Sequence, residues 1–337
     1  MNILITGALG YIGSHVAVKI SEENHNLTLI DNLANSSIKN LKNIEKITRK
    51  KIDFFKLDIR NELKVKKIID EKNIEAIFHF AGLKSVKNSE VNPDDYFDVN
   101  VNGSKTLLSA FEKANGGKKI FIFSSSATVY GNPKILPCKE QHKEKPINTY
   151  GKTKKAVEKI LKIKASKGNW KIASLRYFNP IGSHLSGLIG DNPKGKPENL
   201  LPVINQVAKG EKKELLIFGS DYPTSDGTAI RDYIHIDDLA DGHISTLKYL
   251  SKKRKNVFEV FNLGTGRGYS VLEIKENFEK VNKVSVPHKF FPKRKGDIPI
   301  NYADSYKANS LLKWKTKKSL DQMLKSSWMY EKKNNTN

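Results

Sequence analysis

The chain has 337 residues, 38% of them hydrophobic, with no long uninterrupted apolar run, which allows a large buried core in two lobes or domains and excludes a membrane span. Its 59 Lys and Arg against 36 Asp and Glu give a net charge of +23. That surplus is almost all lysine and is spread along the chain, whereas specific readers of nucleic acid favour arginine. We therefore expect no nucleic-acid partner. A single cysteine, Cys138, excludes an intrachain disulfide, and a strand directly after Met1 leaves no room for a signal peptide, so a cytoplasmic protein is expected.

A glycine-rich turn follows the first predicted strand, at residues 2–6. Gly7, Gly10 and Gly13 are spaced Gly-x-x-Gly-x-x-Gly and precede an apolar helical face at 16–20. Such glycines allow a tight turn in which the backbone N–H groups of a helix start approach a pyrophosphate. The pattern alone is weak, but its place between a strand and a helix favours a dinucleotide site.

Acidic residues end the second and third predicted strands. Asp31 follows the apolar run 27–30, close to the separation expected of a carboxylate that binds the adenosine ribose hydroxyls. A carboxylate there repels a 2′-phosphate, which favours NAD over NADP. The alternative is that Asp31 only caps a turn with Asn32. Asp58 ends the strand at 53–57, where a polar group can reach an adenine edge.

The alternation of strands and helices continues to residue 178. Strands are predicted at 74–80, 119–123 and 171–176, and Pro93 is well placed to begin a long helix that ends at Gly116. The apolar strand 119–123 is typical of a central parallel strand. In open parallel sheets the ligand lies beyond the carboxyl ends of the strands. The predicted fold class is therefore α/β, a Rossmann-type doubly wound parallel sheet with a smaller C-terminal α/β substrate-binding domain.

Tyr150 and Lys154 open an amphipathic run that predicts a helix. Four residues apart, they project from one helix face about one turn apart. Free tyrosine has a pKa near ~10, so a phenolate base at neutral pH needs a pKa about 2–3 pH units lower. A neighbouring ammonium, helped by a cofactor cation, can supply that change. Tyr-x-x-x-Lys also occurs as an aromatic with a lysine packed beside it, so the pair alone leaves both interpretations open.

The regular alternation stops after residue 178. Residues 182–226 are rich in Gly, Pro, Asn and Asp, with one helix predicted after Asn199 and one short strand near 216–219. We expect a NAD-binding domain at 1–178, to which about 234–264 returns, and a substrate-binding domain over the rest of 179–337. The basic tail past Trp328 is expected to fray. The 8 histidines are scattered, and no metal-ligand cluster is present.

Seven motifs spread over the chain carry a resemblance to a known family. They are Thr-Gly-x-x-Gly-Tyr-Ile-Gly-Ser-His at 6–15, His-Phe-Ala-Gly-Leu-Lys at 79–84, Ser-Ser-Ser-Ala-Thr-Val-Tyr-Gly at 124–131, Tyr-Gly-Lys-x-Lys at 150–154, Arg-Tyr-Phe-Asn-Pro at 176–180, Asp-Tyr-Pro-Thr-x-Asp-Gly-Thr at 221–228 and Arg-Asp-Tyr-Ile-His at 231–235. The chain resembles the extended short-chain dehydrogenase/reductase family and, within it, the UDP-glucose (UDP-galactose) 4-epimerases. The second and sixth motifs are the ones most particular to nucleotide-hexose epimerases.

The resemblance implies an isomerase of nucleotide-sugar and galactose metabolism that holds NAD and epimerises UDP-hexoses at C4. Tyr150 would take the proton of the sugar 4-hydroxyl while the C4 hydride passes to the nicotinamide, and the 4-keto intermediate would turn before hydride returns. Lys154 would bind the nicotinamide ribose and lower the pKa of Tyr150. Ser126 would hydrogen-bond the reacting oxygen, with support from Thr128. The resemblance also implies a homodimer, formed through the long helices that begin near Pro93 and Tyr150.

The resemblance also implies two sets of binding residues. Those expected at the cofactor are Gly7, Gly10, Tyr11, Ile12, Gly13, Asp31, Asn32, Asn35, Ser36, Asp58, Ile59, Phe80, Ala81, Gly82, Lys84, Asn100, Ser126, Tyr150, Lys154 and Phe178. Those expected at the UDP-sugar are Asn179, Asn199, Leu200, Phe218, Arg231, Tyr233, Arg294, Asp297 and Asn301, with Arg231 and Arg294 facing the diphosphate. For the apolar members, ordinary core packing is the alternative, and for the two arginines it is surface salt bridging.

Two other functions are possible on the same fold. Nucleotide-sugar 4,6-dehydratases eliminate water with an Asp-Glu pair just after the catalytic hydroxyl residue, where this chain has Ala127 and Thr128. Neither can protonate a leaving hydroxide, so elimination is disfavoured. A regulator or nucleic-acid binder that only senses the dinucleotide needs no base, yet Ser126, Tyr150 and Lys154 are all present.

The breadth of substrate is open at one position. The family often has a tyrosine four positions after the acid of its C-terminal Gly-Asp, here Asp297, and its bulk limits the sugar pocket. This chain has Asn301 there. We hypothesise that the smaller side chain leaves room for an N-acetyl group at sugar C2, so that UDP-N-acetylglucosamine or another UDP-sugar is an alternative substrate.

Overall fold

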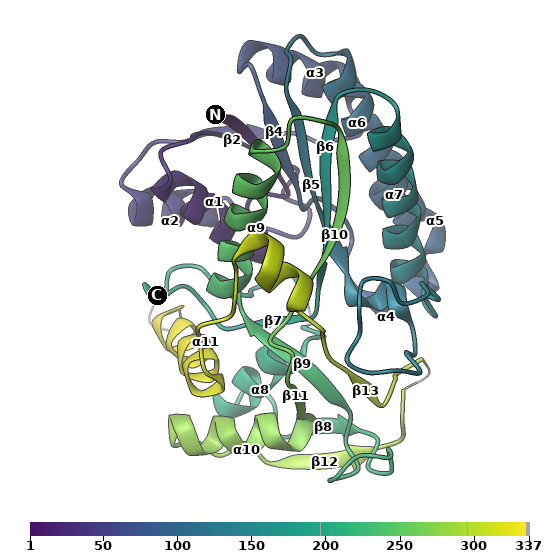
Figure 1. The fold of residues 1–337 in the computed structure, drawn as a ribbon. Helices are drawn as coiled ribbons and strands as arrows, with labels where there is room; N and C mark the ends of the chain where they lie inside the picture. Colours follow the sequence, from purple (N-terminus) through teal and green to yellow (C-terminus); the bar gives the residue numbers. More distant parts are fainter. Residues whose placement is uncertain (196, 295, 335–337) are drawn as a thin grey trace.

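The structure is a computed structural model that describes residues 1–195, 197–294 and 296–334. Its larger part is a seven-stranded parallel sheet, which confirms the predicted fold class (Figure 1). In spatial order the strands are β10 (Val257–Leu263), β6 (Trp170–Tyr177), β5 (Lys119–Ser126), β4 (Ala76–His79), β1 (Asn2–Thr6), β2 (Asn26–Asp31) and β3 (Asp53–Lys56).

Helices cover both faces of this sheet because its strands are apolar on both sides. Along β1, Ile3 and Ile5 join one hydrophobic core, while Leu4 between them joins the other. The first core is completed by α1 (Tyr11–Glu22), α2 (Lys39–Thr48) and α9 (Ile236–Ser251). The second is completed by α3 (Glu62–Glu71), α6 (Gly103–Lys113) and α7 (Thr149–Ser166).

The strand order reverses between β1 and β4. The chain runs outward from β1 through β2 to β3, then returns to pair β4 in parallel on the other side of β1. The loops that follow β1 and β4 therefore diverge and open a crevice at the carboxyl edge of the sheet, which is the usual ligand position in this architecture. The glycine-rich turn lies at this crevice.

The long helix expected from Pro93 is interrupted. It is made of α5 (Pro93–Tyr96), a π-helical turn η1 (Phe97–Asn102) and α6, and a short helix that was not predicted, α4 (Val86–Val91), precedes it. A π-helical turn adds one residue to the helical repeat and so changes the direction of the side chains that follow. Asn100, expected at the cofactor, lies in this turn and is buried.

A smaller lobe lies at the carboxyl edge of the large sheet, in the lower half of Figure 1. Its central strand β9 pairs in parallel with β7 and β13 and antiparallel with β11, and a separate parallel pair joins β8 to β12. The strands are β7 (Asn179–Ile181), β8 (Leu215–Phe218), β9 (Ile230–His235), β11 (Gly268–Ser270), β12 (His288–Phe291) and β13 (Ile300–Asn301); the helices are α8 (Leu200–Ala208), α10 (Val271–Asn282) and α11 (Leu320–Asn334). The remaining turns are η2 (Ala127–Tyr130) and the π-helical η3 (Ala308–Leu312).

The expectation that the chain frays past Trp328 is wrong as far as Asn334. The final helix α11 continues to that residue, and Tyr330 is only 6% exposed. The Lys333 ammonium donates to the Ser186 carbonyl at 2.8 Å, and the Asn334 amide bonds Gly187 at 3.3 Å. Basic composition was a poor guide because one face of α11 packs on the lobe. Residues 335–337 lie outside the described chain.

Candidate active site

The glycine-rich turn owes its conformation to close contacts within the chain itself. Gly7 has a φ of +65°, and a Cβ there would lie 2.6 Å from the Ala81 backbone nitrogen. A Cβ on Gly13 would lie 2.4 Å from the Gly7 carbonyl oxygen, and one on Gly10 would lie 3.3 Å from the same atom. Larger residues would force the β1 and β4 loops apart. The first turn of α1 is thereby brought against the crevice with its backbone N–H groups facing a space that suits a pyrophosphate.

Asp31 supports this turn directly. Its carboxylate accepts hydrogen bonds from the Leu9 and Leu33 backbone N–H groups at 2.9 and 2.8 Å, and from the Ser36 hydroxyl at 2.7 Å. The turn-capping interpretation is therefore correct for the protein alone. A carboxylate has about four acceptor sites, so these three donors leave capacity for a ribose hydroxyl.

Asp58 lies beside Asn32 at the ends of β3 and β2. The Asn32 amide donates to Asp58 at 3.2 Å, and the Arg60 guanidinium donates to both carboxylate oxygens at 3.0 and 2.8 Å. These hydrogen bonds from Arg60 are the main reason that the pKa of Asp58 is lowered to about 2. The carboxylate thus stays ionised, and with the Arg60 backbone N–H at 2.9 Å it accepts four hydrogen bonds within the protein.

Asn100 joins the loop after β4 to helix α7, which carries Tyr150 and Lys154. Its side chain accepts from the Leu83 N–H at 2.7 Å, donates to the Leu83 carbonyl at 3.0 Å and donates to the Thr153 hydroxyl on α7 at 3.2 Å. A Cβ on Gly82 would lie 2.9 Å from the Asn100 amide oxygen. Asn100 therefore positions the loop on which Gly82 and Lys84 stand.

The loop between β7 and α8 crosses to the cofactor side. The Asp191 carboxylate lies 3.4 Å from the Lys84 ammonium, and the Lys194 N–H donates to the Asn35 side chain at 3.0 Å. The Ser85 hydroxyl donates to Glu198 at 2.5 Å. Lys84 and Asn35 are thus held in place by a segment that is far away in the sequence.

The apolar residues expected at the cofactor divide between core and loop. Ile59 and Phe178 are buried at 4% and 7% exposure, which agrees with the packing alternative, while Ile12, Phe80 and Ala81 are only partly buried at the edge of the cores. The centres of the Phe80 and His243 rings lie 5.1 Å apart. A space for a cofactor ring can be bounded by such half-buried side chains.

The four expected catalytic residues come together at the carboxyl end of β5. Tyr150 and Lys154 lie one turn apart on α7, which begins where the Asn148 side chain accepts from the Gly151 N–H at 2.8 Å. Ser126 ends β5, and its hydroxyl accepts from the Thr128 hydroxyl at 3.0 Å and from the Thr128 N–H at 3.2 Å.

The Tyr150 phenol is neutral in the protein by itself. Desolvation raises its pKa to about 12, partly offset by a hydrogen bond with Ser126. The Lys154 ammonium donates to the Ser124 carbonyl at 2.7 Å and lies 5.6 Å from the centre of the Tyr150 ring. Burial lowers the pKa of Lys154 to about 8. The lowering of the tyrosine pKa expected from the pair is therefore not produced by these two residues without a cofactor.

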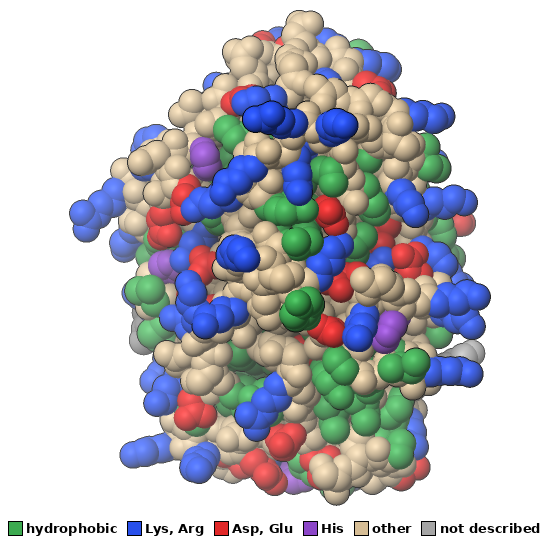
Figure 2. Space-filling model, viewed as in Figure 1, with side chains coloured by type: hydrophobic (Ala, Val, Ile, Leu, Met, Phe, Trp, Pro, Cys, Tyr) green, Lys and Arg blue, Asp and Glu red, His purple; other side chains and the backbone are tan. Residues whose placement is uncertain are grey.

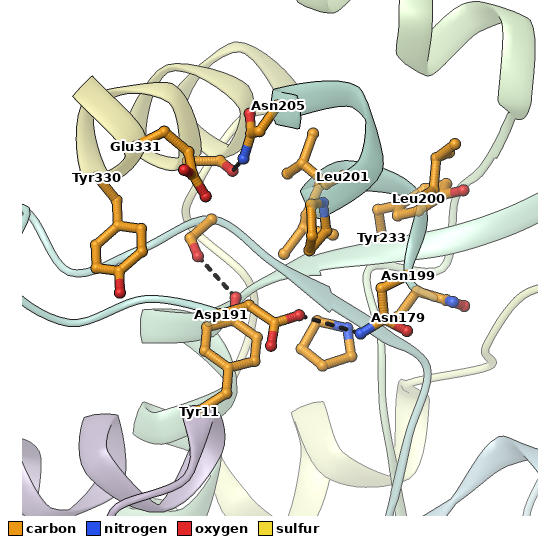
Figure 3. A pocket seen from close by; sticks show the side chains of 15 residues that line it. Tyr11, Asn179, Asp191, Asn199, Leu200, Leu201, Asn205, Tyr233, Tyr330 and Glu331 are labelled. Carbon is orange, nitrogen blue, oxygen red and sulfur yellow. Dashed lines mark hydrogen bonds between the residues drawn. The ribbon is translucent and has the colours of Figure 1, made fainter. Parts of the chain in front are cut away.

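A small cavity lies between α1, β7, β9, α8 and α11 (Figure 3). Four of the predicted sugar residues, Asn179, Asn199, Leu200 and Tyr233, line it together with Tyr11. The Tyr11 hydroxyl donates to the Gly182 carbonyl at 2.7 Å, and the Asn199 amide donates to Asp191 at 3.1 Å. Its volume of about 80 Å³ is too small for a whole nucleotide sugar.

The other predicted sugar residues form a second group on β8, β9 and the loop before β13. Arg294 stacks on the Phe218 ring, with its guanidinium carbon 4.7 Å from the ring centre, and pairs with Asp297 at 2.9 Å. The salt-bridge interpretation therefore holds for Arg294. Among the described residues, no carboxylate forms a salt bridge with Arg231, which donates to the Ile230 carbonyl at 2.8 Å. Burial and, to a smaller extent, the charge of Arg294 lower the pKa of Arg231, and two cations that act on each other suit a diphosphate.

Asn301 lies beside this group on the short strand β13. It is 8% exposed, its backbone pairs with Arg231, and its amide oxygen accepts from the Cys138 thiol at 3.2 Å. The side chain is thus held against Cys138 by a hydrogen bond.

Several residues that support the site were missed from the sequence. Ser124 holds Lys154 through its carbonyl, a contact that side-chain types cannot reveal. Tyr177 donates to His243 at 2.6 Å, because the other ring nitrogen of His243 donates to the Leu239 carbonyl. Asp191 and Tyr330 line the cavity from segments with no recognisable motif. Ser124 and Tyr177 belong to motifs quoted above, and that membership is the signal that the sequence carried for them.

The fold and the site define a dinucleotide-dependent enzyme of the short-chain dehydrogenase type, with a tyrosine and a lysine at the carboxyl edge of a doubly wound sheet. The model of the NAD dependent epimerase/dehydratase family matches residues 3–264. The chain belongs to that family.

Curated relatives and solved structures match over nearly the whole chain. The chain is 47% identical over 337 residues to the UDP-glucose 4-epimerase of Pasteurella multocida, covering 99% of this chain and 98% of that one. Its structure is similar to UDP-glucose-4-epimerase of Stenotrophomonas maltophila with bound NAD and formylated UDP-arabinopyranose, at 42% identity, TM-score 0.97 and coverage of 100% and 99%. It is also similar to UDP-glucose 4-epimerase of Bifidobacterium longum in complex with NAD+ and UDP, at 42% identity, TM-score 0.94 and 99% of each chain.

The described residues contain no group of three His, Cys, Asp or Glu residues that could hold a metal ion. None of their helices is both long and apolar enough to cross a bilayer. On the face shown in Figure 2, Lys and Arg side chains are scattered among acidic ones and do not gather into a single stripe.

Proposed function

We propose that this protein interconverts UDP-glucose and UDP-galactose by NAD-dependent epimerisation at sugar C4. The observation that carries the proposal is the convergence of Ser126, Tyr150 and Lys154 at the carboxyl edge of the sheet, beside the crevice where β1 and β4 diverge. The full-length similarity to UDP-glucose 4-epimerases supports the same reaction.

The residues present fit NAD as cofactor. The glycine-rich turn is closed to any Cβ by backbone atoms of the chain, as a cradle for a pyrophosphate requires, and Asp31 offers a carboxylate where NADP would bring a phosphate. When bound, NAD accepts the C4 hydride and gives it back. We assign its adenosine end to Asp31, Asn32 and Asp58, and its nicotinamide end to Tyr150 and Lys154.

Each catalytic residue of the chain has a separate task in this proposal. Tyr150 takes the proton of the sugar 4-hydroxyl and returns it after the sugar has turned. Lys154 holds the ribose of the cofactor and keeps a positive charge near the phenol. Ser126 donates to the reacting oxygen, and Thr128 orients the Ser126 hydroxyl through the 3.0 Å contact between them.

The smaller lobe holds the UDP-sugar. We assign the diphosphate to Arg231 and Arg294, and we place Asn179, Asn199 and Tyr233 along the remainder of the substrate. The division is the one expected from the sequence, with 1–178 and about 234–264 binding cofactor and the rest of 179–337 binding substrate. Elimination of water is disfavoured, because Ala127 and Thr128 offer no acid.

The substrate test is the purified protein assayed for bound dinucleotide and then against a panel of UDP-sugars. We expect NAD to copurify and UDP-galactose to be converted to UDP-glucose. Turnover of UDP-N-acetylglucosamine is expected if Asn301 leaves space at sugar C2, and no measurable N-acetyl turnover would rule that out. Accumulation of a 4-keto-6-deoxy sugar would instead identify a dehydratase.

We also propose a homodimer formed through the helices that begin at Pro93 and Thr149. Phe97 and Ile163 on these helices are 40% and 49% exposed, and Val91, at the end of α4 just before Pro93, is 70% exposed. Large apolar side chains in such positions are typical of an interface. Light scattering should give twice the mass of one chain, whereas a monomeric mass at micromolar concentration would contradict the dimer.

A further inference from the structure

Three consecutive serines of β5 contact three residues that are spaced one turn apart on α7. The Ser126 hydroxyl is hydrogen-bonded with Tyr150, and the Ser124 carbonyl accepts from Lys154 at 2.7 Å. The Ser125 hydroxyl, between them, donates to Glu158 at 2.5 Å. The reaction proposed above uses the first two of these contacts and leaves Glu158 without a role.

Glu158 is a carboxylate in an interior position. It is 4% exposed, and its two oxygens accept from the Arg176 guanidinium at 3.0 and 2.6 Å. Arg176 itself is 1% exposed and stands directly opposite Ser125 in the parallel register of β5 and β6. Residues of two adjacent strands, β5 and β6, therefore donate hydrogen bonds to one carboxylate of α7. These bonds fix the position of the helix along the sheet and its rotation about its own axis.

The charges around this carboxylate alternate in sign. The Lys154 ammonium lies one helical turn before Glu158, Arg176 lies beyond it, and Glu144 contacts Arg176 from the solvent side. Burial lowers the pKa of Lys154, and the negative charge of Glu158 opposes this by favouring the protonated form.

The other titratable groups around the Lys154 ammonium do not supply a negative charge. His79 on β4 is neutral, with a pKa lowered to about 3 by burial. Tyr150 and, on β6, Tyr177 both have raised pKa values. Glu90 on α4 accepts from the Thr149 N–H at the start of α7. The ammonium is otherwise satisfied by the Ser124 carbonyl and the Phe123 ring, 4.9 Å away.

We propose that Glu158 is a positioning residue for the epimerase reaction: it holds Lys154 and Tyr150 in register with the serines of β5, and its negative charge favours the ammonium form of Lys154. The inference rests on the function proposed above. It predicts that the negative charge of Glu158 sets the pH above which activity falls. Above that pH Lys154 is a neutral amine, which no longer favours the phenolate form of Tyr150.

The test is the pH dependence of kcat for UDP-galactose in the NAD-loaded Glu158→Gln enzyme. The amide keeps the shape and can still accept from Ser125, but the charge is lost, so the pKa of Lys154 falls. The alkaline limb of the kcat–pH profile, where kcat falls as pH rises, should move to lower pH by about one unit. Glu144→Gln is the matched control, because it removes a carboxylate from the same guanidinium at a position that does not face Lys154, and its limb should stay in place.

A wild-type enzyme that does not convert UDP-galactose would contradict the proposed function, whereas an active wild type with an unmoved limb in Glu158→Gln would overturn only the role of Glu158.

Ser125→Ala covers the case in which Glu158→Gln does not fold or retain NAD. It leaves the carboxylate and removes one contact of the helix, so kcat should fall severalfold with an unchanged pH profile and NAD content. Full wild-type kcat in Ser125→Ala would also overturn the proposal.

Discussion

At the residue scale, the chemistry depends on a tyrosine whose surroundings oppose ionisation. Removal of the Tyr150 phenol from water raises its pKa to about 12, and Lys154 points to the Ser124 carbonyl. A bound cofactor that offers a ribose to Lys154 and a cationic ring to the phenol would reverse this balance. We therefore expect activity and cofactor binding to be linked, with the proposed base effective only in the loaded enzyme.

Replacement of Tyr150 by phenylalanine removes the proton acceptor and leaves the ring. We expect kcat to fall about 10²–10⁴-fold. The amount of bound NAD, measured as the dinucleotide released on denaturation, should be unchanged. Tyr306→Phe, at a tyrosine 75% exposed to solvent, is the control and should retain wild-type kcat. Normal turnover in Tyr150→Phe would remove the tyrosine from the mechanism.

Asn301→Tyr tests the size of the sugar pocket. If the small side chain admits an N-acetyl group, the larger one should lower kcat/KM for UDP-N-acetylglucosamine by at least about tenfold while UDP-galactose turnover persists. Cys138→Ala separates size from hydrogen bonding, because it removes only the donor to Asn301. Equal losses on both substrates in Asn301→Tyr would show that position 301 does not discriminate between them.

At the element scale, the glycine-rich turn needs glycine for reasons that are visible without a ligand. A side chain on Gly7 would clash with the β4 loop at 2.6 Å and would require a positive φ. Gly7→Ala should lower the free energy of unfolding by about 2–3 kcal/mol and reduce bound NAD. Gly117→Ala, where an added Cβ meets nothing within 4 Å, should change stability by less than about 0.5 kcal/mol. Denaturant titration checks both, and equal stabilities would contradict the contact argument.

The long, periodic elements of the large sheet could be predicted from the sequence. Apolar runs and the glycines at the ends of elements located β1, β2, β5 and α7 to within a few residues, because local sequence pattern determines these elements. The short strands β7, β11 and β13 could not be predicted, because two or three residues carry no periodicity and their pairing comes from distant segments. The π-helical turn at Phe97–Asn102 was missed for the same reason, since tertiary contacts of Asn100 hold it.

At the scale of the whole molecule, the site is assembled from segments separated by more than a hundred residues. Tyr11 contacts Gly182, and Lys84 contacts Asp191. Motifs identified the residue types at the site, but they could not show that Lys154 rests on Ser124 or that Arg294 pairs with Asp297. The first contact depends on how α7 packs on β5 and the second on the conformation of one loop, and residue types alone encode neither.

Four buried histidines make the folded protein sensitive to acid. Burial lowers the pKa of His15, His79 and His235 to about 3 and that of His243 to about 4. Between these values and ~6.5 the unfolded chain binds protons that the folded chain does not, so stability is lost as pH falls through this window. Burial raises the pKa of Asp237 to about 6 and also raises the pKa values of Glu140, Asp232 and Asp238, which acts in the opposite direction. Burial also lowers the pKa values of His25 and His184, which acts in the same direction as the four histidines.

The melting temperature should therefore fall as the pH is lowered from about 7 to about 5. His79→Gln should weaken this dependence, since it removes one of the groups, whereas His288→Gln, at an exposed histidine, should leave it unchanged. A melting temperature that is constant over this range would contradict the assignment of neutral buried histidines.

The central claim is that the hydride removed from sugar C4 is the one returned. It is tested most directly with UDP-galactose carrying deuterium at C4, converted in ordinary water and followed by NMR of the product. We predict that the deuterium is retained at C4 of UDP-glucose, with a kinetic isotope effect on single turnover and transient absorbance of bound NADH. Loss of the deuterium to solvent would contradict the redox mechanism and the role given to Tyr150.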